Sequence, residues 1–398
     1  MIPVVDKNKC SGCQACVNIC THGCISMEAD GEGFLYPHID HARCIGCGLC
    51  RSVCPSLRKP DMFVQQQVYA ARHGQTEILL KSSSGGVFSA LAEEILKEKG
   101  VVFGACFDER YRVFHQWVDN ESDLDKLRRS KYVQSDIGQS YRQAHEFLEQ
   151  GRPVLFVGTP CQIAGLRNYL NKDYAHLLTA QLICLGVAST GVWQRFLREN
   201  FPSTFPQEIN FRKKDGGWSR YFLGFRVGRQ WVAHSQKQTL AEKIFSFFSM
   251  TPAFVFHNLF LRGYLAGLFL RPSCHLCLSK DLEKRMADVT LGDLWGEWPD
   301  ILTPKNKHEG ISFLGVNTPK GAEYVRKSGI KTMEIDARQA MLHNPAIFRS
   351  CIPHAKRSEF FVRWRKEPLN ALLRELLGIK PFCVTLVKKI YQRFFDGK

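Results

Sequence analysis

Short apolar runs alternate with amphipathic segments from Gln67 onward, and this order predicts a mostly α/β domain. Residues 85–100 place apolar side chains three and four positions apart, which predicts a helix with one buried stripe. Residues 101–107 and 153–158 are almost wholly apolar and predict strands, with a second helix between them over residues 140–151. We therefore expect a mixed helix-and-strand domain over the greater part of the chain.

A basic and aromatic stretch over residues 209–234 predicts a β-hairpin, because apolar and polar side chains alternate on both sides of Gly228. Mixed basic and aromatic residues also occur in nucleic-acid-binding segments. The alternation favours the hairpin, and we expect no nucleic-acid partner. Arg212, Lys213 and Trp218 are candidates for contacting a flavin or an anionic substrate.

A long segment without a formal charge extends from Ile244 to Leu261. Its length raises the question of a membrane span, but Pro252 and several polar residues interrupt it, and Arg262 follows directly. We interpret it as a buried helix broken near Pro252.

The formal charge of +16 over 398 residues is concentrated away from the N-terminus. Residues 1–60 carry six basic and five acidic side chains, net +1, whereas residues 355–398 carry eleven basic and four acidic side chains, net +7. We favour a terminal helix with a solvated basic face over peripheral contact with an anionic membrane or an acidic partner. The composition, 44% hydrophobic and 23% charged, is typical of a globular protein, and we expect a cytoplasmic location.

Eight of the sixteen cysteines form two copies of the spacing C-x2-C-x2-C-x3-C. Three thiolates of one copy can bind three corners of a cubane cluster, while the fourth faces a second cluster. A zinc site would leave the third and fourth cysteines without a role, and disulfides are not expected in a chain of this length without a signal peptide. The spacing predicts an electron-carrying 4Fe-4S dicluster region, with one cluster on Cys10, Cys13, Cys16 and Cys54 and the other on Cys20, Cys44, Cys47 and Cys50.

A further cysteine lies where a predicted strand passes into a helix. Thr159 can cap this helix and Pro160 suits its first position, so Cys161 falls in the first turn, where the helix dipole lowers a thiol pKa. Such a cysteine can be a nucleophile, a redox thiol or a metal ligand. A third 4Fe-4S cluster and a structural zinc site are equally compatible with the other cysteines of this region, which are Cys184, Cys274 and Cys277.

Small polar residues open the predicted helix of residues 85–100. They are Ser83, Ser84, Gly85 and Gly86. Their N–H groups and hydroxyls, with no bulky side chains, suit a phosphate or pyrophosphate group. Helices also begin with Ser and Gly for capping alone, so both interpretations stand on these residues.

Six segments occur in order between about residues 65 and 300: SSSGGVFSAL, LRRSKYVQSDIG, GTPCQIAGLRNYL, INFRKKDGGW, RPSCHLC and ADVTLGDLWG. Together they resemble the coenzyme F-420 hydrogenase/dehydrogenase beta-subunit family, many members of which also carry a dicluster ferredoxin region. The family includes deazaflavin-oxidising and deazaflavin-reducing subunits and many bacterial proteins of unassigned reaction. Some of the latter resemble partners of polysaccharide-synthesis enzymes.

The resemblance implies an FAD cofactor and a 4Fe-4S cluster held by Cys161, Cys184, Cys274 and Cys277. The flavin contacts expected from it are Ser83, Ser84, Gly85, Gly86, Thr159 and Gln162, to which Arg212 and Lys213 are added as candidates. Leu185 stands where many relatives are expected to have a histidine, which implies altered chemistry if that histidine handles protons near the substrate.

We expect a ferredoxin-like domain followed by a larger mixed α/β domain that binds the flavin and the third cluster. The predicted regions are residues 1–62 for the dicluster domain, 65–150 and 151–330 for two parts of the flavoprotein domain, and 331–398 for a basic helical tail. The predicted function is an oxidoreductase that couples one-electron transfer through clusters to two-electron chemistry at FAD. Its redox partner would be a ferredoxin or a catalytic subunit, and a deazaflavin or another small molecule its substrate. The alternative is an electron-transfer subunit that has no substrate site and supplies a separate catalytic partner.

Overall fold

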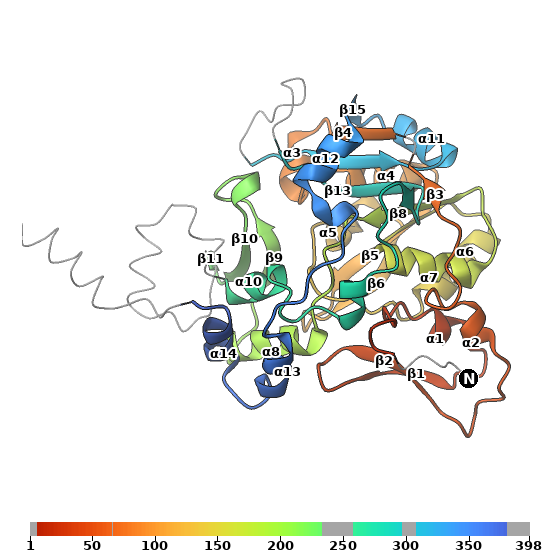
Figure 1. The fold of residues 1–398 in the computed structure, drawn as a ribbon. Coiled ribbons are helices and arrows are strands. Elements are labelled where there is room, and N and C mark those ends of the chain that lie inside the picture. The colour runs from red at the N-terminus through yellow and green to blue at the C-terminus, as the bar shows by residue number, and fades with distance from the viewer. Residues whose placement is uncertain (1–5, 66, 233–257, 297–307, 380–398) are drawn as a thin grey trace, which may run out of the picture. The chain divides into compact units, whose positions relative to one another are not determined.

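The computed structural model describes residues 6–65, 67–232, 258–296 and 308–379 (Figure 1). They form two compact units, which are described separately below. The first contains the chain up to Thr190 together with residues 270–352, and the second contains residues 191–269 and those from Pro353 onward. Most of the uncharged segment predicted to be a broken helix lies outside the described residues. No described helix is long and apolar enough to cross a bilayer.

An eight-stranded mixed sheet forms the centre of the first unit. In spatial order it comprises β15 (Lys331–Glu334), β4 (Gln67–Arg72), β14 (Ser312–Val316), β13 (Val289–Asp293), β8 (Leu177–Leu182), β7 (Val154–Gly158), β5 (Val101–Phe107) and β6 (Val113–Val118). Strands β5, β7, β8 and β13 are parallel neighbours, and the outer pairings are antiparallel. The predicted mixed α/β domain is therefore confirmed.

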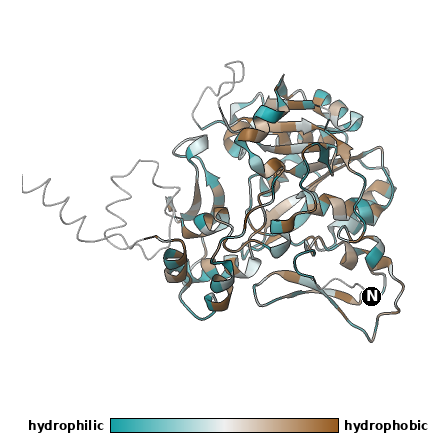
Figure 2. Cartoon of the chain, in the orientation of Figure 1, coloured by the Kyte–Doolittle hydropathy of each residue, from teal (hydrophilic) through white to brown (hydrophobic). Residues whose placement is uncertain are grey.

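Helices cover both faces of this sheet. They are α3 (Thr76–Lys81), α4 (Val87–Lys97), α5 (Leu124–Leu127), α6 (Ser140–Glu149), α7 (Pro160–Leu170), α11 (Pro319–Lys327) and α12 (Ala337–His343). Successive strand residues point to opposite faces: Val102 and Leu155 belong to the core that includes α4 and α11, whereas Phe103 and Phe156 belong to the core that includes α6 and α7. The strands are accordingly mostly hydrophobic, while the helices carry both kinds of residue (Figure 2).

The cysteine-rich N-terminal region packs on the α6 and α7 side. Its elements are α1 (Ala15–Ile19), β1 (Ile25–Ala29), β2 (Leu35–Ile39) and α2 (Leu49–Ser52), and β3 (Phe63–Val64), which follows, pairs with β12 (Lys284–Arg285). Cys13, Ala15 and Val53 lie in the same hydrophobic core as the inner side chains of α6 and α7. The region is thus built into the first unit rather than tethered to it.

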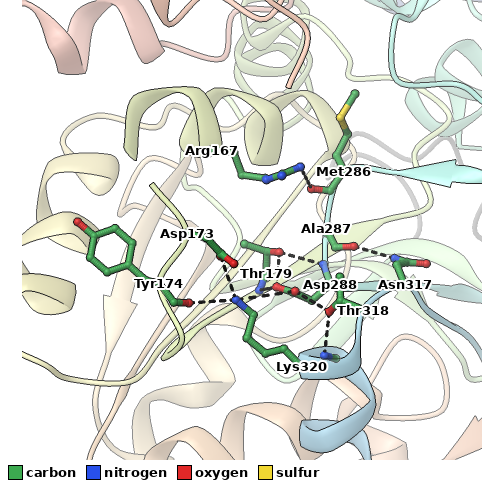
Figure 3. Close-up of polar contacts among 11 residues, drawn as sticks. Arg167, Asp173, Tyr174, Thr179, Met286, Ala287, Asp288, Asn317, Thr318 and Lys320 are labelled. Carbon is green, nitrogen blue, oxygen red and sulfur yellow. Dashed lines mark hydrogen bonds and ion pairs between the residues drawn. The ribbon is translucent and has the colours of Figure 1, made fainter. Parts of the chain in front are cut away.

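A buried carboxylate joins the middle of the sheet to α11 (Figure 3). Asp288, 3% exposed, accepts hydrogen bonds from the backbone N–H and the hydroxyl of Thr179 at 2.8 and 2.7 Å. Its other oxygen accepts from the Thr318 hydroxyl at 2.7 Å, and Lys320 Nζ lies 3.9 Å away. Thr318 also caps α11, because its hydroxyl accepts from the N–H of Gly321. The side chain of Asp288 therefore aligns β8, the start of β13 and α11.

The second unit contains a small antiparallel sheet and helices around an aromatic core. Its elements are α8 (Thr190–Asn200), β9 (Glu208–Lys213), β10 (Phe222–Val227), β11 (Gln230–Val232), α10 (Leu259–Leu265), α13 (Arg357–Arg363) and α14 (Leu369–Leu376). The predicted hairpin is confirmed, because β10 pairs antiparallel with β11 and Gly228 has a φ of 60° in the turn. Trp193 is fully buried against Phe260 and Phe211, with ring centroids 4.8 and 5.1 Å apart.

The predicted helical tail over residues 331–398 is wrong at its start. Residues 331–334 form β15, which pairs with β4 in the main sheet. The basic charge that suggested a solvated tail lies in residues 355–398, whereas residues 331–334 carry one lysine and one glutamate and form a mostly exposed edge strand of the kind that charged side chains protect. Helices α13 and α14 follow only after Pro353, and they belong to the second unit.

Candidate functional site

The cysteines of the doubled motif form two groups in space. Burial raises the pKa of Cys13, Cys16 and Cys54, and charge on neighbouring thiolates within the group Cys10, Cys13, Cys16 and Cys54 raises it further. The same holds for Cys50 with Cys44 and Cys47, and Cys24 Sγ lies 3.3 Å from Cys20 Sγ and also near Cys44. The last cysteine of each copy therefore lies with the first three of the other, which is the arrangement that crossed ligation requires.

The first of these groups lies against helix α7. Gly165 has no side chain, and a Cβ built there would lie 3.1 Å from Cys13 Sγ and 2.9 Å from the Tyr141 hydroxyl. Cys161 precedes Gly165 by one helical turn and therefore shares its face of α7. The side chain of Ser11, between Cys10 and Cys13, lies close enough to Cys161 to lower the pKa of its thiol. The N-terminal cysteines and Cys161 are thus immediate neighbours.

Cys161, Cys184, Cys274 and Cys277 form a further group. Cys161 begins α7, Cys184 follows β8, and Cys274 lies in the short 3-10 helix η4 (Pro272–Leu276). These thiols lie close enough together to interact electrostatically. Cys161 interacts with Cys277, Cys184 interacts with Cys161 and Cys277, and Cys274 interacts with all three of the others. The fold therefore gathers four cysteines from three separate parts of the sequence.

Burial raises the pKa of Cys161, Cys184 and Cys274. It raises the pKa of Cys184 to about 12 and that of Cys274 well above its ordinary value. The lowered pKa predicted for Cys161 at a helix N-terminus is wrong, because desolvation outweighs the hydrogen bond between Cys161 Sγ and Thr159 Oγ1, which are 3.2 Å apart. A free reactive thiolate is therefore disfavoured here, whereas a metal centre would hold the thiols deprotonated.

Two cations lie beside the cysteines. Lys280 Nζ donates to the backbone oxygen of Cys184 at 2.6 Å and lowers the pKa of Cys184 against the effect of burial. Arg271, with no exposed surface, donates from Nε to the backbone oxygen of Cys10 at 2.8 Å and lowers the pKa of Cys161. Positive charge buried next to four thiols suits a cluster whose thiolate ligands leave it net negative.

Gln162 has a structural role that the sequence did not indicate. Its Oε1 accepts from the Thr159 backbone N–H at 2.9 Å, and its Nε2 donates to Ser135 Oγ at 2.9 Å. Ser135 donates in turn to His115 Nδ1 at 2.8 Å, because His115 Nε2 must donate to the backbone oxygen of Val157 at 3.0 Å. The amide of Gln162 thereby holds the start of α7, and with it Cys161, in place.

The serine and glycine run before α4 is largely engaged within the protein. Gly85 N–H donates to Ser312 Oγ at 2.8 Å, and the Ser84 hydroxyl donates to the backbone oxygen of Ile311 at 2.8 Å. A Cβ at Gly85 would lie 2.3 Å from the backbone oxygen of Ala71. Close packing against β4 and β14 therefore accounts for Gly85 without a bound phosphate.

A second loop reaches this run. Ser130 N–H donates to Ser83 Oγ at 2.9 Å, and the next residue, Lys131, donates to the backbone oxygens of Arg128 and Arg129 at 2.9 and 3.2 Å. Desolvation lowers the pKa of Lys131 to about 7. Ser83 is thus tied to the loop of Ser130, while the amine of Lys131 is held by backbone oxygens of that same loop.

The other two flavin candidates lie in the second unit, at the end of β9. Arg212, 2% exposed, stacks on Tyr221 with its guanidinium carbon 4.2 Å from the ring centroid. Lys213 pairs with Asp215 at 2.7 Å and lies 4.8 Å from the centre of the Trp231 ring. Both cations are therefore held by side chains of their own unit.

Sequence reasoning missed Arg271 and Gly165. Arg271 immediately precedes the segment PSCHLC, but nothing in the sequence indicates that its charge is buried. Gly165 looks like an unfavourable helix-interior residue, and only the approach of Cys13 explains it.

Among the described residues, no three Cys, His, Asp or Glu side chains surround one point closely enough for a single metal ion. A cubane needs a wider arrangement, because each of its four thiolates binds a different iron. The four thiols, their burial and the adjacent cations therefore fit a 4Fe-4S cluster at this site.

The fold and these cysteine groups define an iron-sulfur protein of the oxidoreductase class. Residues 9–57 match the 4Fe-4S dicluster domain, and residues 151–340 match the family described as the C terminus of the coenzyme F420 hydrogenase/dehydrogenase beta subunit. The chain therefore contains a C-terminal domain of the coenzyme F420 hydrogenase/dehydrogenase beta-subunit type, preceded by a 4Fe-4S dicluster domain near its N-terminus.

Similarity to a curated protein and to a solved structure was found in addition. The chain is 30% identical over 170 residues to the coenzyme F420-dependent sulfite reductase of Methanocaldococcus jannaschii, a match that covers 41% of this chain and 26% of that protein. A chain in a structure of the F420-reducing [NiFe] hydrogenase complex from Methanosarcina barkeri is 18% identical, with a TM-score of 0.45. That similarity covers 73% of this chain and 91% of the other.

Proposed function

We propose that this protein is an iron-sulfur flavoprotein oxidoreductase that connects the two N-terminal clusters to FAD through a third 4Fe-4S cluster. The ligands of the third cluster would be Cys161, Cys184, Cys274 and Cys277. Clusters carry single electrons and a flavin carries one or two. Such a protein can therefore transfer electrons between one-electron carriers and two-electron substrates. The observation that carries the proposal is the contact of Cys161 with the loop of Cys10 and Cys13.

The surrounding residues of this chain have defined tasks in the proposal. Gly165 lets Cys13 approach α7, and Ser11 spans the gap to Cys161. Thr159 and Gln162 fix the first turn of α7, and Lys280 supplies positive charge beside Cys184. Electron transfer between two sites needs short, fixed separations, and each of these contacts provides one.

The flavin part of the proposal rests on the family and on the start of α4. Since Ser84 and Gly85 are engaged within the protein, we place the phosphate contacts at Ser83 and Gly86 rather than at the whole predicted run. Thr159 and Gln162 then contribute by ordering α7, and Arg212 and Lys213 remain candidates from the second unit.

Metal and flavin content test the proposal. Protein purified without oxygen should contain about twelve irons, four for each of three clusters, and one FAD per chain. Cys274→Ser should lose about four irons, whereas Cys106→Ala, which removes a buried cysteine of β5, should keep all twelve. Eight irons with bound zinc in the wild type would contradict the third cluster, and an iron-complete protein that binds no FAD would contradict the flavin.

A deazaflavin is the first substrate to test, because the sulfite reductase that resembles this chain is named for coenzyme F420. The match spans only 26% of that enzyme, which favours the alternative of a subunit that passes electrons to a separate catalytic partner. Reduction of the FAD-loaded protein should decrease its visible absorbance. Addition of the substrate should reoxidise the protein and restore that absorbance. Failure with every small acceptor, together with a stoichiometric partner on purification, would establish the alternative.

A further inference from the structure

Arg271 is a fully buried cation whose partners are neutral protein groups. Its Nε and Nη2 donate to the backbone oxygens of Cys10 and Leu35 at 2.8 and 3.0 Å, and its Nη1 donates to Gln134 Oε1 at 2.8 Å. Its guanidinium carbon lies 4.2 Å from the centre of the Tyr36 ring. In the part of the chain that the structure describes, no carboxylate lies within ion-pair distance of Arg271.

Such burial is costly unless a negative charge is nearby, because an isolated ion loses its hydration. The group next to the guanidinium that becomes anionic is a thiol: Arg271 Nη2 lies 3.7 Å from Cys10 Sγ. Cys10 is a predicted ligand of the first N-terminal cluster. The cluster with its thiolate ligands would therefore supply the negative charge that balances the buried guanidinium of Arg271.

The backbone of Arg271 also contacts the group of Cys161, Cys184, Cys274 and Cys277. Its N–H donates to the oxygen of Val187 at 3.0 Å, and its oxygen accepts from the N–H of Cys274 at 2.9 Å. Arg271, the residue directly before η4, thus extends its side chain from the Cys274 side across to the Cys10 loop. A shift in either loop would break contacts with the other.

We propose that Arg271 is a positioning and tuning residue for electron transfer: its buried charge raises the reduction potential of the cluster on Cys10, Cys13, Cys16 and Cys54, and its contacts fix that cluster relative to Cys274. The second half rests on the proposed third cluster. A cation and an N–H···S contact stabilise the more negative, reduced state of a cluster, because the added electron is attracted to the fixed charge.

The test is a reductive titration of the full chain, followed by electron paramagnetic resonance. Arg271→Gln removes the charge but keeps an amide donor, and it should move one N-terminal cluster to a more negative potential while the other stays unchanged. Arg271→Lys retains the charge and should shift that potential less. Arg142→Gln is the matched control, because Arg142 holds the same region through the backbone oxygens of Asn18 and Cys20 but makes no contact with Cys10.

A second variant keeps the test decisive if Arg271→Gln loads iron poorly. Gln134→Glu leaves Arg271 in place and sets a carboxylate against its Nη1, so it should move the same potential in the same direction. Iron-complete Arg271→Gln or Gln134→Glu with a wild-type potential would overturn the proposal. Eight irons in the wild type would instead contradict the third cluster and leave the N-terminal potential measurable.

Discussion

Cys13 packs directly on Gly165. A Cβ at Gly165 would lie 3.1 Å from both Cβ and Sγ of Cys13, and Cys161 lies one turn earlier on the same helix. The absence of one methyl group therefore determines how closely the N-terminal cysteines approach the larger domain.

Gly165→Ala should destabilise the protein, contrary to helix propensity. In an open helix position this change would stabilise by about 1 kcal/mol, but overpacking against Cys13 and Tyr141 should cost about 1–3 kcal/mol. Thermal unfolding and iron content of the variant measure the effect, and we expect both to fall. Gly74→Ala, where a Cβ meets nothing within 4 Å, is the control. A Gly165→Ala protein that is as stable and as iron-rich as the wild type would show that this contact does not matter.

Asp288→Ala should destabilise the first unit by about 2–4 kcal/mol, because it leaves the hydroxyls of Thr179 and Thr318 buried without their acceptor. Asp173 also pairs with Lys320, at 3.3 Å, but its side chain is 92% exposed. Asp173→Ala should therefore change stability by less than about 0.5 kcal/mol. Denaturant unfolding of the two variants checks the contrast, and equal losses would mean that burial of the carboxylate is not decisive.

His115 should make the protein acid-sensitive. Burial lowers its pKa from 6.5 to about 4, with a further lowering by Lys131 and an opposing effect of Asp136. The unfolded state therefore binds more protons between pH 6.5 and 4, so the free energy of unfolding falls as the pH decreases through this range, by up to about 3 kcal/mol.

The variant His115→Gln isolates this contribution. It should be less stable than the wild type at pH 7, where the hydrogen bonds to Ser135 and Val157 are lost, but its stability should depend less on pH between 6.5 and 4. Unfolding measured at several pH values checks the prediction. Parallel curves for the two proteins would show that His115 does not titrate in this way.

The local sequence determined the strands and helices and the cysteine spacing of the two N-terminal cluster sites. The strands around Phe103 and Phe156 and the start of α7 at Pro160 follow from apolar patterning and capping, which act within a few residues. The doubled motif is equally local, since three of four cysteines for each cluster lie within seven residues of one another.

Tertiary structure decided what depends on burial and on distant neighbours. It joined Cys161 and Cys184 with Cys274 and Cys277, raised the pKa of Cys161 by desolvation, and engaged Ser84 and Gly85 in packing. It also placed the charge of Arg271, which looks in the sequence like an ordinary surface residue, beside Cys10. Spacing along a chain determines local ligand geometry, but solvation and long-range contact exist only once the chain has folded.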